Sequence, residues 1–264
     1  MSERVVTRIE DGVAIVTLSR ADKRNGLDLA MFDAVVAAGE AISANNEIRA
    51  VVLHGDGKAF CAGLDFKWFM SNPVEGQRLL ARTDASIANL AQRIAWIWQE
   101  VPVPVIAAVH GVAFGGGLQL ALAADIRYVT ADAQLSVMEI KYGLIPDMSI
   151  TQTLLKLVPA DRAKELTFTG RIISGSEAVA LGLATEVSED PLAAAMETAR
   201  TIASKSPHAI RAGKALFNQA GDLPAAEAFT LETELQVGLL GSANQLEAVQ
   251  SSMMKRPAKF RDPE

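Results

Sequence analysis

Two glycine-rich segments about fifty residues apart carry the first signs of chemistry in this chain. They are residues 57–65 (GKAFCAGLD) and residues 111–119 (GVAFGGGLQ). Each follows an apolar run typical of a β-strand and leads towards a helical pattern. Such a turn leaves backbone N–H groups free at a helix N-terminus, where the helix dipole favours negative charge. If the two turns meet in space, one N–H from each could hold a single oxyanion, an enolate or a tetrahedral oxygen.

Two carboxylates follow the second glycine segment. Glu139 stands in an otherwise apolar setting, and burial there would raise its pKa and suit it to proton transfer near neutral pH. The alternative is a structural glutamate paired with Lys141 or with an arginine, and position alone leaves both interpretations open. Asp147 precedes an expected helix, so a role as N-cap is the simpler interpretation for it.

Other catalytic patterns are missing from the sequence. It has no Gly-x-Ser-x-Gly elbow and no Walker A sequence, which argues against an α/β-hydrolase serine and a P-loop. The histidines His54, His110 and His208 are scattered, so we expect no metal, and we interpret His110 as a hydrogen-bonded turn residue. The single Cys61 excludes an intramolecular disulfide and suits a reducing compartment. We interpret it as a packed turn residue rather than a nucleophile.

The composition describes an acidic globular chain. It has 264 residues, 50% hydrophobic and 21% charged, with a formal net charge of −6. This is enough for one large domain or a domain with an appendage, and the net charge gives no support for nucleic acid or an anionic membrane as partner. The longest uncharged run, residues 101–124, is broken by prolines and glycines, so we expect no membrane span. With no signal-peptide pattern at the start, we expect a cytoplasmic protein.

Repeated strand, turn and helix patterns must position these residues. Asp11-Gly12 predicts a hairpin between residues 5–9 and 13–18, and Asp28 predicts a helix N-cap. The repeat suggests right-handed crossovers with the turns gathered at one end of a sheet, where ligands bind. Further strands are predicted at residues 50–54, 103–109, 126–130 and 185–187. Helices are predicted at residues 28–45, 75–100, 116–124 and 149–158.

The C-terminal part of the chain is predicted to be helical throughout. We therefore divide the chain into an α/β core, residues 1–195, which holds the active site, and a helical region, residues 196–264. An all-helical tail of this kind suits packing against another subunit or covering a site. The expected helices after Asp190 span residues 191–205, 208–220, 224–240 and 244–254.

Taken together, these segments resemble the crotonase superfamily, the enoyl-CoA hydratase/isomerase family, over residues 5–260. The resemblance implies an α/β fold, a crotonase-like spiral of ββα units with an α-helical C-terminal region, assembled as a homotrimer or a hexamer. It implies a coenzyme A thioester as substrate and no separate cofactor. The matching pieces, in chain order, are residues 20–27 (RADKRNGL), 57–65, 111–119, 124–128 (ADIRY), 139–152 and 165–170 (ELTFTG).

The resemblance also assigns residues by position. The oxyanion hole would be the N–H groups of Leu64 and Gly116, and the adenine end of CoA would lie near Ala62. Two fixed N–H donors lower the barrier to a thioester enolate, each by roughly 3 kcal/mol in other systems. The residues implied near the CoA phosphates are Lys23, Arg24 and Lys255.

One position departs from the hydratase pattern. Hydratases of this family use two glutamates to activate water; Glu139 matches the second, whereas the first falls at Gln119. An amide can orient water but cannot exchange a proton as a carboxylate does. The pair Glu139 and Asp147 instead resembles dienoyl-CoA isomerases, although those carry an aspartate at the position of Gln119.

The leading hypothesis is therefore double-bond isomerisation, with Glu139 as general acid/base, Asp147 as its partner and Gln119 orienting substrate or water. A hydratase in which Gln119 positions the water that Glu139 activates is the alternative, and a CoA-binding pseudoenzyme is a third. Acyl length would depend on the pocket walls, where the aromatic candidates Phe66, Trp68, Phe69, Trp96 and Trp98 are more often core residues.

Overall fold

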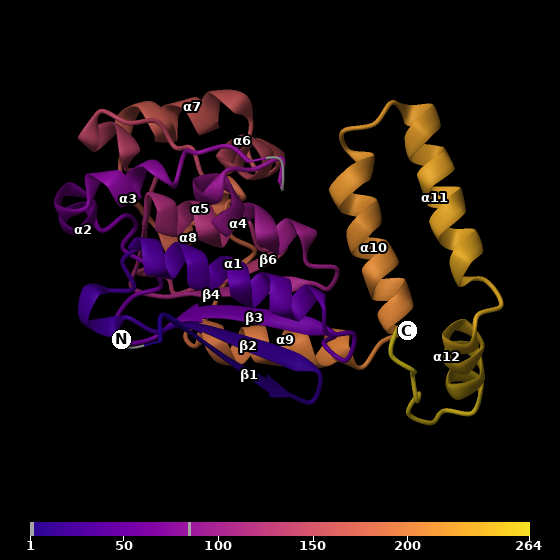
Figure 1. Cartoon of the computed structure of the whole chain (residues 1–264). Coiled ribbons are helices and arrows are strands. Elements are labelled where there is room, and N and C mark those ends of the chain that lie inside the picture. Colours follow the sequence, from indigo (N-terminus) through magenta and orange to yellow (C-terminus); the bar gives the residue numbers. More distant parts are fainter. Residues whose placement is uncertain (1–2, 84–85) are drawn as a thin grey trace.

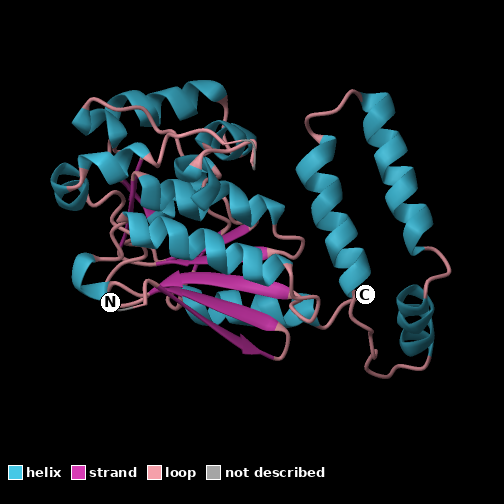
Figure 2. Cartoon of the chain, viewed as in Figure 1, coloured by secondary structure: helices cyan, strands magenta, loops and turns pink. Residues whose placement is uncertain are grey.

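The main sheet has six strands in the order β1-β2-β3-β4-β6-β9 (Figures 1 and 2). β1 and β2 pair antiparallel around Asp11-Gly12, as the sequence predicted, and every other neighbouring pair in this sheet is parallel. The computed structural model describes residues 3–83 and 86–264. The strands are β1 (Val5–Glu10), β2 (Val13–Leu18), β3 (Ala50–Gly55), β4 (Val105–Val109), β6 (Ile126–Val129) and β9 (Glu186–Val187).

Helices cover both faces of this sheet. In β2, Ala14, Val16 and Leu18 face the larger core, which α1 (Leu29–Ser43) and α4 (Leu90–Glu100) complete. Val13 and Ile15 face the opposite side, where α9 (Pro191–Ala203) packs. This alternation follows from the two-residue period of a strand. A strand buried on both faces therefore reads as a continuous apolar run, as β2, β3 and β4 do.

The N-terminus of α1 is capped as predicted. The Asp28 carboxylate accepts a hydrogen bond from Met31 N–H at 2.9 Å. It also accepts from Arg4, with 2.7 Å between Nη2 and Oδ2. Burial alone would raise the pKa of Asp28, but these hydrogen bonds outweigh it and hold the pKa below its usual range.

The predicted helix over residues 75–100 is wrong. The structure has α2 (Phe66–Ser71), α3 (Pro73–Gln77) and then α4, with part of the interval lying outside the described residues. α4 starts afresh because Asn89 and Gln92 form a capping box, in which each side chain accepts a hydrogen bond from the other's N–H. The helix predicted at residues 149–158 is likewise shorter, being α6 (Ile150–Thr153) followed by the 3₁₀ turn η3 (Leu154–Lys156).

The structure also has a second, three-stranded sheet that was not predicted. Its order is β5-β7-β8, with β5 inside the second glycine segment. α5 (Gly116–Leu122) follows β5 directly, so the predicted helix at residues 116–124 is confirmed apart from its end. The remaining elements here are β5 (Val112–Phe114), β7 (Gln134–Ser136), β8 (Ile173–Ser174), α7 (Ala160–Thr169) and α8 (Gly175–Leu181).

The four predicted C-terminal helices are confirmed. They are α9, α10 (Pro207–Ala220), α11 (Ala225–Leu239) and α12 (Ala243–Met253). α9 packs on the sheet, whereas α10 to α12 stand beside the α/β body (Figure 1). The boundary placed between residues 195 and 196 stays a prediction, and it falls inside α9. No helix in the described part of the chain is long and apolar enough to cross a membrane.

Candidate active site

The two glycine segments meet in space, as the sequence analysis required of an oxyanion site. Cys61 N–H donates to Val112 O at 3.0 Å, and Phe114 N–H donates to Cys61 O at 3.1 Å. Two glycines permit this approach. Gly63 has a φ of +84°, and a Cβ there would stand 2.4 Å from Phe114 O; a Cβ on Gly117 would stand 2.2 Å from Cys61 O. Side chains at these positions would force the turns apart.

The contact leaves two N–H groups unpaired, one from each turn. Leu27 pairs with the residues on either side of Leu64: its N–H donates to the Gly63 carbonyl at 2.8 Å, and its carbonyl accepts from the Asp65 N–H at 2.9 Å. This pairing does not use the Leu64 N–H. Within the described residues, neither the Leu64 N–H nor the Gly116 N–H donates to a protein acceptor. Buried polar groups are normally paired, so this geometry is suited to receiving an external oxygen.

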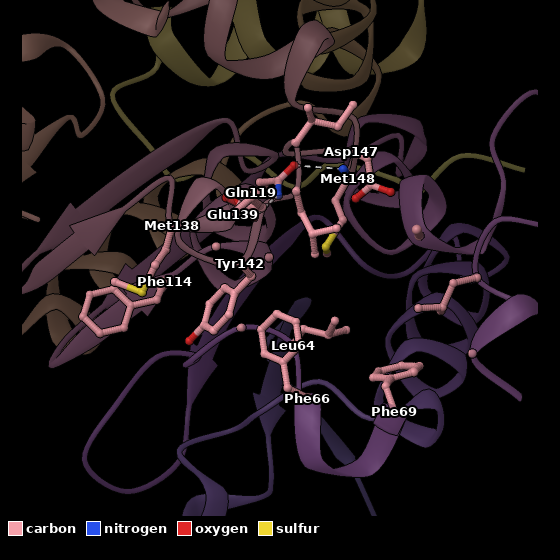
Figure 3. Close-up of a pocket in the computed structure, with 18 of the residues that line it drawn as sticks. Leu64, Phe66, Phe69, Phe114, Gln119, Met138, Glu139, Tyr142, Asp147 and Met148 are labelled. Carbon is pink, nitrogen blue, oxygen red and sulfur yellow. Dashed lines mark hydrogen bonds between the residues drawn. The ribbon is translucent and has the colours of Figure 1, made fainter. Parts of the chain in front are cut away.

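Leu64 and Gly116 both line a cavity of about 690 Å³. Its wall brings together six of the candidate catalytic, oxyanion-hole and CoA-binding residues, and aromatic and aliphatic side chains form most of the remainder (Figure 3). An apolar cavity with a few convergent polar groups is the usual form of a small-molecule site. The six residues are Ala62, Leu64, Gly116, Gln119, Glu139 and Asp147.

Gln119, on α5, is 1% exposed and holds Glu139 directly. Its Oε1 accepts a hydrogen bond from Met148 N–H at 2.8 Å, and its Nε2 donates to Glu139 Oε1 at 2.6 Å (Figure 3). The backbone N–H can only donate, so it fixes which end of the amide is oxygen. The other end is therefore the NH₂ group, and Glu139 Oε1 is the acceptor.

Glu139 begins the 3₁₀ turn η2 (Glu139–Tyr142), which follows β7. Burial raises its pKa, and the nearby charge of Asp147 raises it further, while its own backbone N–H and Gln119 act in the opposite direction. Among the described residues no cation pairs with Glu139; Lys141 instead lies 5.8 Å from the centroid of the Tyr142 ring. The alternative of a structural ion pair is therefore wrong, and a half-buried carboxyl remains that is suited to proton exchange.

Asp147 is not a helix cap, which corrects the simpler interpretation of its sequence. α6 begins at Ile150, its N-cap is Ser149, and no side chain accepts a capping hydrogen bond. Asp147 instead lines the cavity with Glu139, and burial raises its pKa as well. Two carboxyl groups with raised pKa values thus face one cavity, an arrangement typical of acid–base sites.

The comparisons with known proteins agree with this geometry. The family model for enoyl-CoA hydratase/isomerase matches residues 8–263. The chain belongs to the enoyl-CoA hydratase/isomerase family, within the crotonase superfamily. It is an acyl-CoA enzyme by family, with the crotonase fold that the resemblance implied.

Relatives within the enoyl-CoA hydratase/isomerase family carry different activities in their names. YngF, a family protein of Bacillus subtilis, is 34% identical over 254 residues, covering 94% of each chain. The mitochondrial Delta(3,5)-Delta(2,4)-dienoyl-CoA isomerase of Rattus norvegicus is 33% identical over 262 residues, covering 96% of this chain and 80% of the isomerase. The crystal structure of an enoyl-CoA hydratase from Bacillus anthracis superposes with a TM-score of 0.90, at 30% identity, covering 97% of this chain and 98% of the hydratase.

The basic residues implied near CoA lie outside the cavity wall of this enoyl-CoA hydratase/isomerase family protein. The Arg24 carbonyl accepts from Ala62 N–H at 2.9 Å, so the exposed Lys23 and Arg24 stand next to the cavity edge. Lys255 does not line the cavity; it follows α12, which stands beside the α/β body with α10 and α11 (Figure 1). Within one copy of the chain, the structure does not bring Lys255 together with the other candidate residues.

The aromatic candidates divide between wall and core. Phe66 and Phe69 line the cavity, and the Phe66 ring centroid lies 4.1 Å from that of Tyr142. Trp98 is completely buried in the core, Trp68 packs against that core, and Trp96 lies in a separate hollow. Sequence reasoning missed Tyr142, although it stands only three residues after Glu139.

Two other predictions from the sequence are confirmed. Burial raises the pKa of the Cys61 thiol to about 12, so it stays protonated and is a packed turn residue. The His110 ring nitrogen Nε2 lies 3.0 Å from Gly57 O, so this histidine braces the first glycine segment.

Proposed function

We propose that this protein shifts a double bond along an enoyl-CoA, with Glu139 carrying the proton. The thioester oxygen would accept hydrogen bonds from the N–H groups of Leu64 and Gly116. Glu139 as carboxylate removes a proton from the carbon next to the thioester, and the electron pair passes onto the thioester oxygen. The protonated Glu139 then returns a proton two carbons further along, and the double bond moves into conjugation.

The 2.6 Å contact between Gln119 and Glu139 carries this proposal. A water held between the two side chains by one hydrogen bond to each would separate the bonded atoms by roughly 4.5 Å. Their direct contact leaves no space for that water. It supports proton shuttling over the alternative, an enoyl-CoA hydratase in which Gln119 positions water for Glu139.

Asp147 supports the same chemistry as partner of Glu139. It faces the same cavity, and its charge raises the pKa of Glu139. A base with a raised pKa binds the transferred proton more firmly, and so keeps it available for return to the substrate. Under this proposal Asp147 tunes Glu139, and the two N–H donors stabilise the enolate by roughly 3 kcal/mol each, as in other oxyanion holes.

CoA recognition and assembly complete the proposal. Lys23 and Arg24 would bind phosphates beside Ala62, and CoA would enter as part of the substrate with no separate cofactor. Exposed apolar side chains on the C-terminal helices, such as Phe217 at 82% and Phe229 at 64%, support packing of α10 to α12 against other copies in a homotrimer or hexamer. Lys255, which follows α12, would then meet CoA bound to a neighbouring copy.

Chromatographic separation of the products, followed by mass spectrometry, tests the proposed reaction. Purified protein is incubated separately with a 3-enoyl-CoA and with a 2-enoyl-CoA of equal length. We expect interconversion of the two isomers with no change in mass. A 3-hydroxyacyl-CoA, heavier by one water, as the main product would make the protein a hydratase. Calorimetric binding of acyl-CoA with no turnover across a panel of enoyl-CoAs would make it a pseudoenzyme.

A further inference from the structure

The ionisable side chains in the wall of the cavity are acidic. Its titratable side chains are two carboxyls, Glu139 and Asp147, and one phenol, Tyr142. Among the described residues that line it, none is lysine, arginine or histidine. Any negatively charged group on an acyl chain would therefore enter next to two carboxyls, with no cation among the described lining residues to pair with it.

Two arginines associated with elements that line the cavity are engaged elsewhere. Arg20 Nη2 lies 2.8 Å from Asp65 Oδ2 and 3.5 Å from Asp28 Oδ2. Arg93, on α4, pairs with Glu40 at 3.0 Å and with Glu100 at 2.9 Å. Redirecting Arg20 into the cavity would take its charge away from Asp65, and redirecting Arg93 would take its charge away from Glu40 and Glu100, which costs free energy in each case.

Apart from Gln119, the other side chains of the wall are apolar, and they come from several elements. Phe32 belongs to α1, Phe69 to α2, and Leu79 and Leu80 follow α3. Leu64 and Phe66 complete this side, opposite Asp147 (Figure 3). Such walls bind methylene groups by removing them from water, at about 0.8 kcal/mol for each CH₂. They offer a carboxylate neither a hydrogen-bond donor nor a compensating charge.

We infer that this cavity selects uncharged, apolar acyl chains and rejects acyl chains that end in a carboxylate. The inference rests on the proposed function only in that the acyl part of the CoA thioester occupies this cavity. Burying an unpaired carboxylate beside two like charges costs enough to weaken binding by about a hundredfold or more. A neutral acyl chain of the same length buries no charge in this cavity, so its binding is not weakened in this way.

Calorimetry with two unreactive ligands tests the selection without requiring turnover. Hexanoyl-CoA and adipoyl-CoA have six acyl carbons each, and only adipoyl-CoA ends in a carboxylate. We expect hexanoyl-CoA to bind more tightly than free CoA and about a hundredfold more tightly than adipoyl-CoA. Equal affinity for the two thioesters would overturn the selection and leave isomerisation of neutral substrates standing. Equal affinity for hexanoyl-CoA and free CoA would overturn both the selection and the placement of the acyl chain.

A charge placed in the wall separates electrostatic exclusion from steric exclusion. Leu80 lines the cavity and is 61% exposed, so the Leu80→Arg variant can hold its guanidinium in water and still reach a carboxylate. Leu80→Gln is the matched uncharged control. We expect Leu80→Arg to strengthen adipoyl-CoA binding at least about tenfold relative to Leu80→Gln, with little change for hexanoyl-CoA. No difference between the two variants for adipoyl-CoA would overturn the electrostatic account.

Discussion

The hydrogen bond from Gln119 to Glu139 can be removed in two different ways. Gln119→Met fills a similar volume but can neither donate to Glu139 Oε1 nor accept from Met148 N–H. Gln119→Glu keeps an acceptor for Met148 N–H but places a like charge where the donor was, 2.6 Å from Glu139 Oε1 in the wild type. The two variants share only one loss, the donor to Glu139.

The expected size of the effect follows from the nature of this bond. A hydrogen bond to a charged group contributes roughly 1.5–3 kcal/mol. Its loss destabilises the ionised form of Glu139, so the pKa of Glu139, already raised by burial, rises further in both variants. If the carboxylate is the base, activity at neutral pH falls by roughly tenfold to a hundredfold. Part of this activity returns as the pH increases, because the base is ionised again.

The assay is the pH dependence of kcat/KM for isomerisation, accompanied by urea unfolding. We expect the rising limb of the profile to move to higher pH in both variants. Gln119→Met also leaves Met148 N–H unpaired and should lose about 1–3 kcal/mol of unfolding free energy. Exposed Gln152 on α6 provides the control, and Gln152→Met should change neither quantity. Lower activity with an unmoved rising limb would refute the reasoning, since it would reduce Gln119 to a packing residue.

Three further substitutions test other parts of the structure. Asp147→Asn removes the charge that raises the pKa of Glu139, so the rising limb of the pH profile should move to lower pH, opposite to the Gln119 variants; a shift to higher pH would contradict this. Gly63→Ala forces a side chain into a φ of +84° and within 2.4 Å of Phe114 O; urea unfolding should show a loss of about 1–3 kcal/mol, and wild-type stability would contradict the close approach of the turns. Asp28→Ala removes the cap of α1 and the pair with Arg4, and should cost about 2–4 kcal/mol at neutral pH. Because the pKa of Asp28 is lowered, its contribution is complete above the usual aspartate pKa of about 4 and is lost as the pH falls below that; a cost that persisted unchanged at pH 2 would contradict the assignment.

Local signals in the sequence predicted the fold where one or two residues decide an element. The Asp11-Gly12 turn and the Asp28 cap did so for the first hairpin and α1, and both are observed. The prediction of one helix over residues 75–100 was wrong because the apolar pattern continues through the point where a new helix, α4, begins. Asn89 and Gln92 form the capping box at that point. A capping box of this kind uses residue types that also occur inside helices, so the pattern alone could not reveal it.

The residues of the site could be predicted from the sequence, but the orientation of the Gln119 side chain could not, because a backbone N–H far along the chain determines it. The glycine spacing indicated paired N–H donors, and Glu139 was a candidate base from its apolar surroundings. No sequence pattern indicated that Met148 N–H would orient the amide of Gln119, because this contact joins a helix to a loop 29 residues later. The same contact turns Gln119 towards Glu139 rather than towards the open cavity, and the choice between water and proton chemistry depends on it.

Hydrogen exchange between substrate and solvent tests the central claim most directly. In D₂O, wild-type protein acting on a 3-enoyl-CoA should produce the 2-enoyl isomer with deuterium two carbons beyond the carbon next to the thioester, and the reverse reaction should place deuterium on the carbon next to the thioester. Glu139→Gln should bind hexanoyl-CoA normally but lose both isomerisation and deuterium incorporation by about 10² to 10⁴-fold. Isomerisation and exchange at wild-type rates in Glu139→Gln would contradict the account, because the proton would then have another carrier.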